Sequence, residues 1–91
     1  MFRIEGIKTA ETLEQERYES ECENVRAKRD RLIAQEDWRY ARYASEIRQG
    51  LTPSDDIEAL DAYFQALRDI PTQEGFPWNV KWPILEQPHE N

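Results

Sequence analysis

Residues 10–49 contain neither proline nor glycine, and most of them are good helix formers. This stretch constrains the fold more than any other feature, because a run of that length without a breaker predicts helix throughout. Thr9 or Thr12 is a suitable cap for its start, and Gly50 is a suitable stop for its end. We therefore expect a long helical region over 9–49, preceded by a short arm at 1–8.

The apolar residues of this region recur at spacings of three and four, which places most of them on one helix face. The stripe slips between Ile33 and Tyr40, and Asp37 followed by Trp38 falls in the gap. Aspartate is a residue type that caps helices, so the slip predicts a kink near Asp37. The pattern leaves open whether the stripe packs within a helical hairpin or mediates self-association, since tyrosine and Cys22 suit a coiled-coil seam poorly.

A second helix is predicted at 53–70. Thr52 followed by Pro53 is a start signal, with Thr52 as the cap and Asp55 in the first turn. Proline at position 71 then ends the helix, because the residue before a proline avoids helical geometry. The helix has one apolar face, formed by Ile57, Leu60, Tyr63, Phe64 and Leu67.

The remaining residues, 71–91, are predicted to form an extended arm, and the fold class is therefore all-α. Proline residues keep this segment from becoming a helix. Apolar and other residues alternate along it, which points four apolar side chains in one direction if the chain is extended. The rings could fold back on the helices or be presented to a partner, and the sequence leaves both open. The four residues are Phe76, Trp78, Val80 and Trp82.

Charge and composition exclude several functions. The net charge of −7 disfavours nucleic acid and anionic membranes as partners, because both attract basic proteins. The chain has no apolar run long enough to cross a membrane, and its start lacks the apolar core of a signal peptide. We expect a protein of the cytoplasm in which it is made.

The residues needed for catalysis are nearly absent. His89 is the single histidine and lies near the end of the chain, whereas Cys22 lies on the apolar stripe, where burial would make it unreactive. Asp55, Asp56, Glu58 and Asp61 lack the glycine and the ligand spacing of a calcium loop. The sequence therefore predicts no enzyme, no cofactor and no metal site. Seven of the ten aromatic residues are tryptophan or tyrosine, which dominate binding interfaces.

Two segments resemble a known family. RDRLIAQEDW, residues 29–38, and LDAYFQALRDIPTQEGFPWNVKWP, residues 60–83, are similar to the small phage tail assembly chaperones. The resemblance covers about residues 26–83, with an Asp-Trp pair, an Ala-Leu-Arg-Asp-Ile-Pro helix end and a Phe-Pro…Trp-Pro tail. Its structural motif corresponds to Asp37, Arg68, Asp69, Pro71, Pro77 and Pro83.

The resemblance implies a non-enzymatic protein that binds a phage tail or tail-fibre protein during assembly in the host bacterial cytoplasm. We expect Trp38 to pack near the end of the second helix, where Arg68 and Asp69 fix the turn by hydrogen bonds and ion pairs. A permanent place in the virion tail and an inhibitor of a host protein remain alternatives, as does a homo-oligomer formed through the N-terminal helix. The expected partner-binding residues are Trp38, Tyr63, Phe76, Trp78 and Trp82.

Overall fold

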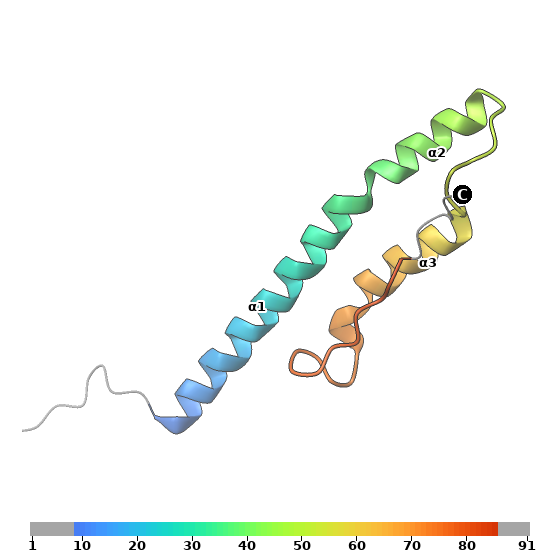
Figure 1. Ribbon diagram of the computed structural model, residues 1–91. Coiled ribbons are helices and arrows are strands. Elements are labelled where there is room, and N and C mark those ends of the chain that lie inside the picture. Colours follow the sequence, from blue (N-terminus) through green and yellow to red (C-terminus); the bar gives the residue numbers. More distant parts are fainter. Residues whose placement is uncertain (1–8, 86–91) are drawn as a thin grey trace, which may run out of the picture.

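The computed structural model describes residues 9–85, and the expected arm at 1–8 and the last residues of the chain lie outside this range. Within it the chain is all-α, as predicted. Two consecutive helices form one long bent rod, and a third helix returns antiparallel beside it (Figure 1). The elements are α1 (Ala10–Glu36), α2 (Trp38–Arg48), α3 (Ile57–Arg68) and a short 3₁₀ turn, η1 (Ile70–Thr72).

The rod bends at Asp37, which confirms the predicted kink. The amide of Asp37 still donates to the carbonyl of Ile33, at 2.9 Å, as in a regular helix. The amide of Tyr40, however, donates to the backbone carbonyl of Asp37, at 3.2 Å, which forms a tighter turn. The indole of Trp38 donates to the carbonyl of Gln35, at 2.9 Å. Asp37 itself makes no capping bond with its side chain. The bend is therefore stabilised by Trp38, and not by an aspartate cap as the sequence suggested.

The third helix begins at Ile57, not at Pro53 as predicted. Asp56 is its cap, and the carboxylate of Asp56 accepts from the amides of Glu58 and Ala59 at 3.0 and 3.4 Å. Thr52 and Pro53 lie instead in the connection from α2, which turns at Gly50 with a φ of 73°. The start signal at Pro53 is overridden by a long-range contact of Asp55, which holds the connection against α2.

That contact is a buried ion-pair network. The carboxylate of Asp55 accepts from the guanidinium groups of Arg39 and Arg42, each at 2.7 Å, and Arg39 also binds Glu36 at 2.6 Å. Burial by itself raises the pKa of Asp55, but the hydrogen bonds from Arg42 and Arg39 outweigh it and lower that pKa. Both Arg39 and Asp55 are buried. Of the four neighbouring carboxylates, Asp55 therefore joins α2 to the start of α3, and Asp56 caps α3.

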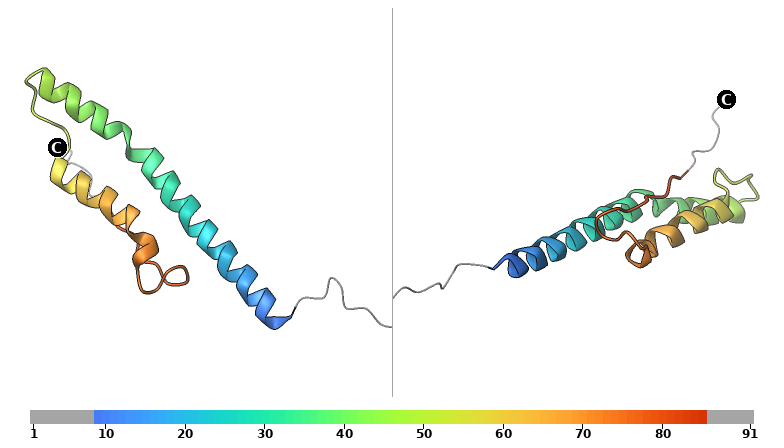
Figure 2. Two further views of the ribbon diagram at one scale, coloured as in Figure 1. Left: turned by 180° about the vertical axis from the view of Figure 1, so that it is seen from behind. Right: turned by 90° about the horizontal axis from the view of Figure 1, so that it is seen from below.

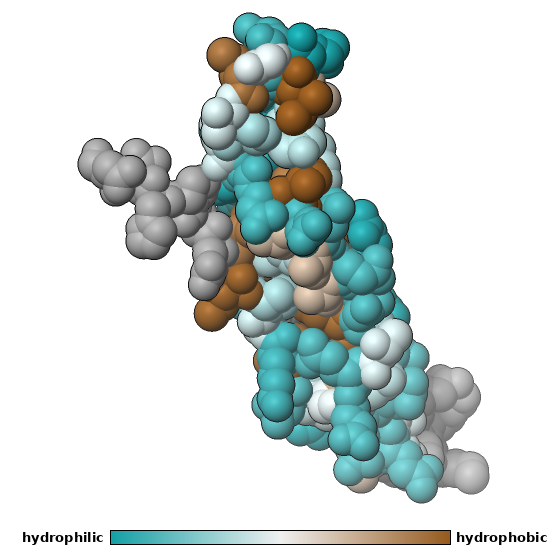
Figure 3. Space-filling model, turned by 90° about the vertical axis from the view of Figure 1, so that its right-hand side faces the viewer, coloured by the Kyte–Doolittle hydropathy of each residue, from teal (hydrophilic) through white to brown (hydrophobic). Residues whose placement is uncertain are grey.

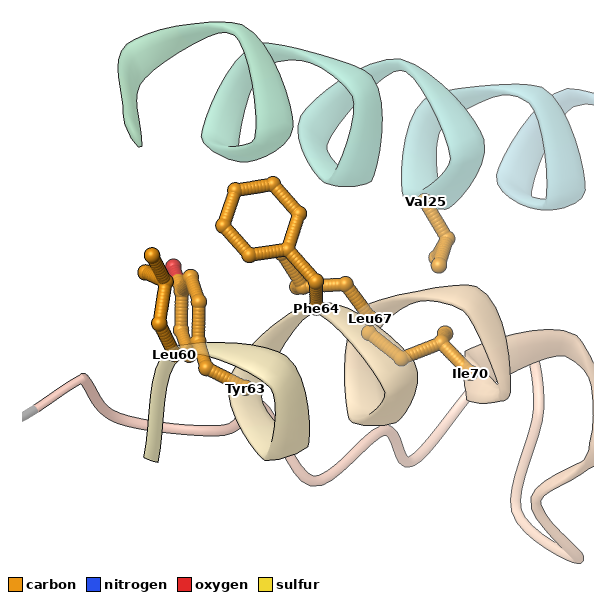
Figure 4. Packing of buried hydrophobic residues seen from close by; sticks show 6 residues of the cluster. All are labelled: Val25, Leu60, Tyr63, Phe64, Leu67 and Ile70. Atoms are coloured by element: carbon orange, nitrogen blue, oxygen red, sulfur yellow. The ribbon is translucent and has the colours of Figure 1, made fainter. Parts of the chain in front are cut away.

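The core lies between α3 and the middle of the rod (Figure 4). Leu67 and Ile70 are completely buried, and Val25 reaches them from α1. Tyr40 packs edge-on against Phe64, with ring centroids 5.2 Å apart, and its hydroxyl donates to Asp61 at 2.7 Å. Burial and this hydrogen bond raise the pKa of Tyr40 to about 12. The buried cluster comprises Val25, Leu60, Tyr63, Phe64, Leu67 and Ile70.

The C-terminal segment turns back after η1 and runs along the helical pair (Figure 2). Phe76, Val80, Trp82 and Leu85 are partly buried against the core cluster. This segment thus adds hydrophobic contacts to those between the helices. A chain of only 91 residues needs them, because a small chain buries a smaller fraction of its surface than a large one.

Candidate partner-binding surface

Residues 73–81 form a closed loop whose shape is set by hydrogen bonds. The side-chain amide of Gln73 donates to the carbonyl of Lys81 at 2.8 Å and accepts from the amide of Lys81 at 2.9 Å. Inside the loop, the amide of Asn79 donates to the carbonyl of Gly75 at 2.7 Å. A Cβ at Gly75 would overlap the carbonyl oxygen of Asn79, so this close approach requires glycine. The loop is therefore held in one shape before any partner binds.

The loop buries one residue and exposes the next. Pro77 is fully buried, and the peptide bond before it is cis, whereas Trp78 is 60% exposed. The expectation that Phe76, Trp78 and Trp82 point in one direction is wrong for Trp78. Alternation requires an extended chain, and here the chain turns between Gln73 and Lys81. Beyond the turn, from Val80 to Leu85, the segment is extended as predicted.

Two of the expected binding aromatics, Phe76 and Trp82, lie against cations of α1. The guanidinium carbon of Arg26 lies 5.4 Å from the ring centroid of Phe76, and the ammonium nitrogen of Lys28 lies 4.4 Å from that of Trp82. Both rings are half-buried. Cations over aromatic faces contribute about 0.5–1 kcal/mol each when exposed. Tyr63 is buried in the core, so its ring has little surface left for a partner.

Trp38 is half-exposed, but it does not lie where the sequence suggested. Its ring lies 4.7 Å from the guanidinium carbon of Arg42 and 5.6 Å from that of Arg39. These arginines bind Asp55, just before α3, so Trp38 lies near the beginning of α3 and not near its end. The antiparallel course of α3 explains the error, because its last residues lie opposite Val25.

Arg68 and Asp69 fix the end of α3 by hydrogen bonds, as expected, but neither forms an ion pair among residues 9–85. Both side chains bond to Gln65, Asp69 at 3.0 Å and Arg68 at 3.4 Å. The carbonyl of Asp69 also accepts from the hydroxyl of Thr72 at 2.6 Å. Pro71 lies within η1, and Pro83 is half-buried at the edge of a groove that includes Ala59 of α3.

Trp78 forms a wall of two open grooves along α1. The first, of about 410 Å³, is lined by Trp78 with Glu14, Arg17 and Tyr18. The second, of about 430 Å³, runs between α1 and the loop and includes Val25, Val80 and Trp82. Tyr18 is also exposed, and its hydrogen bond with Cys22 raises the pKa of Tyr18. Two exposed aromatic rings thus line one groove at the N-terminal half of α1.

Sequence reasoning missed the residues that build this surface. Gln73 and Gly75 shape the loop, Arg26 and Lys28 anchor it, and Tyr18 lies beside Trp78. Gly75 directly before Phe76 and Pro77 was a usable signal for a tight turn. The other four residues contribute through contacts with residues distant in the sequence, which a local sequence pattern cannot reveal.

The chemistry of this surface suits apolar contacts. An exposed tryptophan on a preformed loop gives large contact area at low entropic cost. No helix within residues 9–85 is long and apolar enough to cross a membrane.

Comparison with known proteins supplies the biological context. The family model for the phage tail assembly chaperone protein matches residues 22–88, which is most of the chain. Searches among curated proteins and among solved structures found no significant match. The matched region begins near the middle of α1 and includes the bend, α3 and the Trp78 loop. The chain therefore belongs to the phage tail assembly chaperone family, whose role is in the assembly of phage tails.

Proposed function

We propose that this protein is a non-enzymatic chaperone that binds a tail or tail-fibre protein in the host cytoplasm through the surface around Trp78. The observation that carries the proposal is Trp78, which is 60% exposed on a loop that fully buries Pro77 beside it. Incomplete tail proteins expose apolar surface and strand edges, which aggregate unless another protein covers them.

Among the five aromatics that the sequence singled out, Trp78 and Trp38 retain the most exposed surface. Trp78 is the stronger candidate, because the grooves beside it are also lined by Tyr18 of α1 and by Trp82 of the C-terminal segment. Trp38 is engaged by Arg42 and by its bond to Gln35, which assigns it first to the bend. We assign Phe76 and Trp82 to positioning the loop, and Tyr63 to the core.

Co-expression tests the proposal. A tail or tail-fibre protein of the phage that encodes this chain would be produced with and without it, and the soluble fraction of the tail protein would be measured. We expect the wild-type chain to raise that fraction and Trp78→Ala to lose most of the effect. The matched control is Ile47→Ala, at an exposed apolar residue near the end of α2. Equal solubility of the tail protein with and without the chain would refute the proposal.

A second measurement separates a chaperone from a permanent tail component. Mass spectrometry of purified particles would detect the chain in the virion if it stays there. We expect it to be absent or far below the amount of the tail proteins. Stoichiometric presence would establish the structural alternative instead.

A further inference from the structure

The ring of Trp78 is held in place by the loop that carries it and not by polar contacts of its own. Within residues 9–85 its side chain has no hydrogen bond, no cation over its ring and no stacked aromatic partner. Trp82, by contrast, lies 4.4 Å from the ammonium nitrogen of Lys28, and the indole of Trp38 donates to the backbone of Gln35. Any contact that fixes the loop therefore also fixes the position of Trp78.

The position of this ring matters because it stands between two grooves. Residues 10–20 form a projecting segment of α1, which extends past α3 and the loop (Figure 1), and all of them are exposed. Tyr18 of this segment lines one groove with Trp78, whereas Val80 and Trp82 line the other. On the face shown in Figure 3, apolar patches are separated by hydrophilic surface. A partner on such a surface depends on a few rings at fixed positions and not on one broad apolar area.

One side chain joins the two ends of the loop. The amide nitrogen of Gln73 donates to the carbonyl of Lys81, at 2.8 Å, and its amide oxygen accepts from the backbone amide of Lys81, at 2.9 Å. A side-chain amide carries a donor and an acceptor side by side, whereas a carboxylate only accepts and an ammonium group only donates. An amide side chain is thus the chemical group that can pair with both backbone groups of one residue.

This pair connects two segments that are anchored separately. The backbone amide of Gln73 donates to the carbonyl of Ile70, at 3.1 Å, and Ile70 is completely buried in the core. Lys81 directly precedes Trp82, whose ring lies against Lys28 of α1. The pair therefore ties the end of η1 to the segment that lies along α1, and the loop between them has only one way to close.

We propose that Gln73 is the positioning residue of the partner-binding surface and acts through Trp78. Both hydrogen bonds of its side chain lie at the exposed surface, so water can replace them without disturbing the helices. Without the pair the loop samples other shapes, and only the closed fraction presents Trp78 correctly. The apparent Kd for a partner then rises by the inverse of that fraction. The inference rests on the proposed function and names the residue that prepares its surface.

Nuclear magnetic resonance tests this positioning without any partner. Nitrogen-15 relaxation and hydrogen exchange would be measured on the full chain and on Gln73→Met, which keeps the length of the side chain but lacks both polar atoms. We expect lower order parameters for the amide and indole groups of Trp78, and exchange of the Lys81 amide at least about fivefold faster. Gln73→Glu, whose carboxylate can accept but not donate, should also loosen Trp78.

Gln49→Met is the matched control, because the amide of Gln49 also makes two exposed hydrogen bonds, both to Ser45 at the end of α2. It should leave the order parameters of Trp78 unchanged. The indole of Trp38 serves as a control within each spectrum, since it is bound at the bend. Order parameters of Trp78 that stay at the wild-type value in both Gln73 variants would overturn the inference.

Binding distinguishes positioning from a merely structural role. For a tail protein that the wild-type chain keeps soluble, the apparent Kd of Gln73→Met should rise about three- to tenfold, while its far-ultraviolet circular dichroism stays that of the wild type. Gln49→Met should bind like the wild type. A loss of helix that accounts for the weaker binding, or wild-type affinity in Gln73→Met, would contradict the proposed role.

Failure of this inference and failure of the proposed function give different results. If the wild-type chain keeps the tail protein soluble and Gln73→Met does so equally well, the proposed function stands and the role of Gln73 is refuted. If Gln73→Met loosens Trp78 but the wild-type chain does not keep the tail protein soluble, the chaperone proposal fails, and the control of Trp78 by Gln73 stands.

Discussion

The two ends of the helical rod differ in how their side chains are used. Near the bend, charged groups are matched in a buried network, with Asp55 held between Arg39 and Arg42. At the start of α1 every side chain up to Ser20 is exposed, and glutamates outnumber basic residues. One end is thus committed to internal contacts that define the fold, whereas the other leaves its side chains exposed, and we propose that a partner binds there. If this comparison is right, mutations should separate stability from binding according to the end that they affect.

The core should give the largest effect on stability. Leu67→Ala removes a completely buried side chain between α3 and α1 and should lower the free energy of unfolding by about 3.5 kcal/mol. Leu13→Ala, at an exposed position of the projecting segment, should change it by less than about 0.5 kcal/mol. Urea denaturation followed by circular dichroism measures both. Similar losses in the two variants would show that the projecting segment contributes as much to folding as the core does.

The buried ion pairs should give the next largest effect. Asp55→Ala leaves two arginines without their carboxylate and should cost about 2.5 kcal/mol at neutral pH. Because folding lowers the pKa of Asp55 below its ordinary 3.8, its contribution is complete above that pH and is lost as the pH falls through the lowered pKa. The difference between Asp55→Ala and wild type should therefore shrink in acid.

Asp30→Ala is the control for this network, since Asp30 forms an exposed pair with Arg29, at 3.1 Å. It should change stability by less than about 0.5 kcal/mol at any pH. An Asp55→Ala deficit that stays constant from neutral pH into acid would argue against the ion pairs as its source.

Substitutions of two glycines should separate the effect of the 73–81 loop from that of the connection between α2 and α3. Gly75→Ala forces the side chain into the carbonyl of Asn79, so the loop must open, at a cost of about 2 kcal/mol. Gly50→Ala has free space but a positive φ and should cost about 1 kcal/mol. The sharper difference lies in binding, which Gly75→Ala should weaken and Gly50→Ala should leave unchanged. Both are measured by thermal denaturation and by the co-expression assay.

The sequence predicted the features that depend on local chemistry. A stretch without proline or glycine became the rod, and the slip of the apolar stripe became the bend at Asp37. Where a distant contact competes with a local signal, prediction failed. The start signal at Pro53 did not set the start of α3, because Asp55 binds arginines that lie 13 and 16 positions earlier in the chain.

The same reasoning explains the tryptophans of the C-terminal segment. The alternating pattern predicted the same environment for Trp78 and Trp82, because side chains four residues apart point the same way in an extended chain. Gln73 breaks that equivalence by pairing with the backbone of Lys81, eight positions away. Proline and aromatic content identified the segment that we propose binds a partner, but only the closed loop decides which ring is exposed.

Trp78→Ala should have the smallest effect on stability and the clearest effect on binding. Its ring is largely exposed, so truncation removes few internal contacts, and the free energy of unfolding should change by less than about 0.5 kcal/mol. Trp82→Ala removes a half-buried ring and its contact with Lys28, and should cost about 1–2 kcal/mol by the same urea titration. A greater loss from Trp78→Ala would mean that the ring supports the loop itself. The two ends of the rod would then both serve the fold, and the binding surface would have to lie elsewhere.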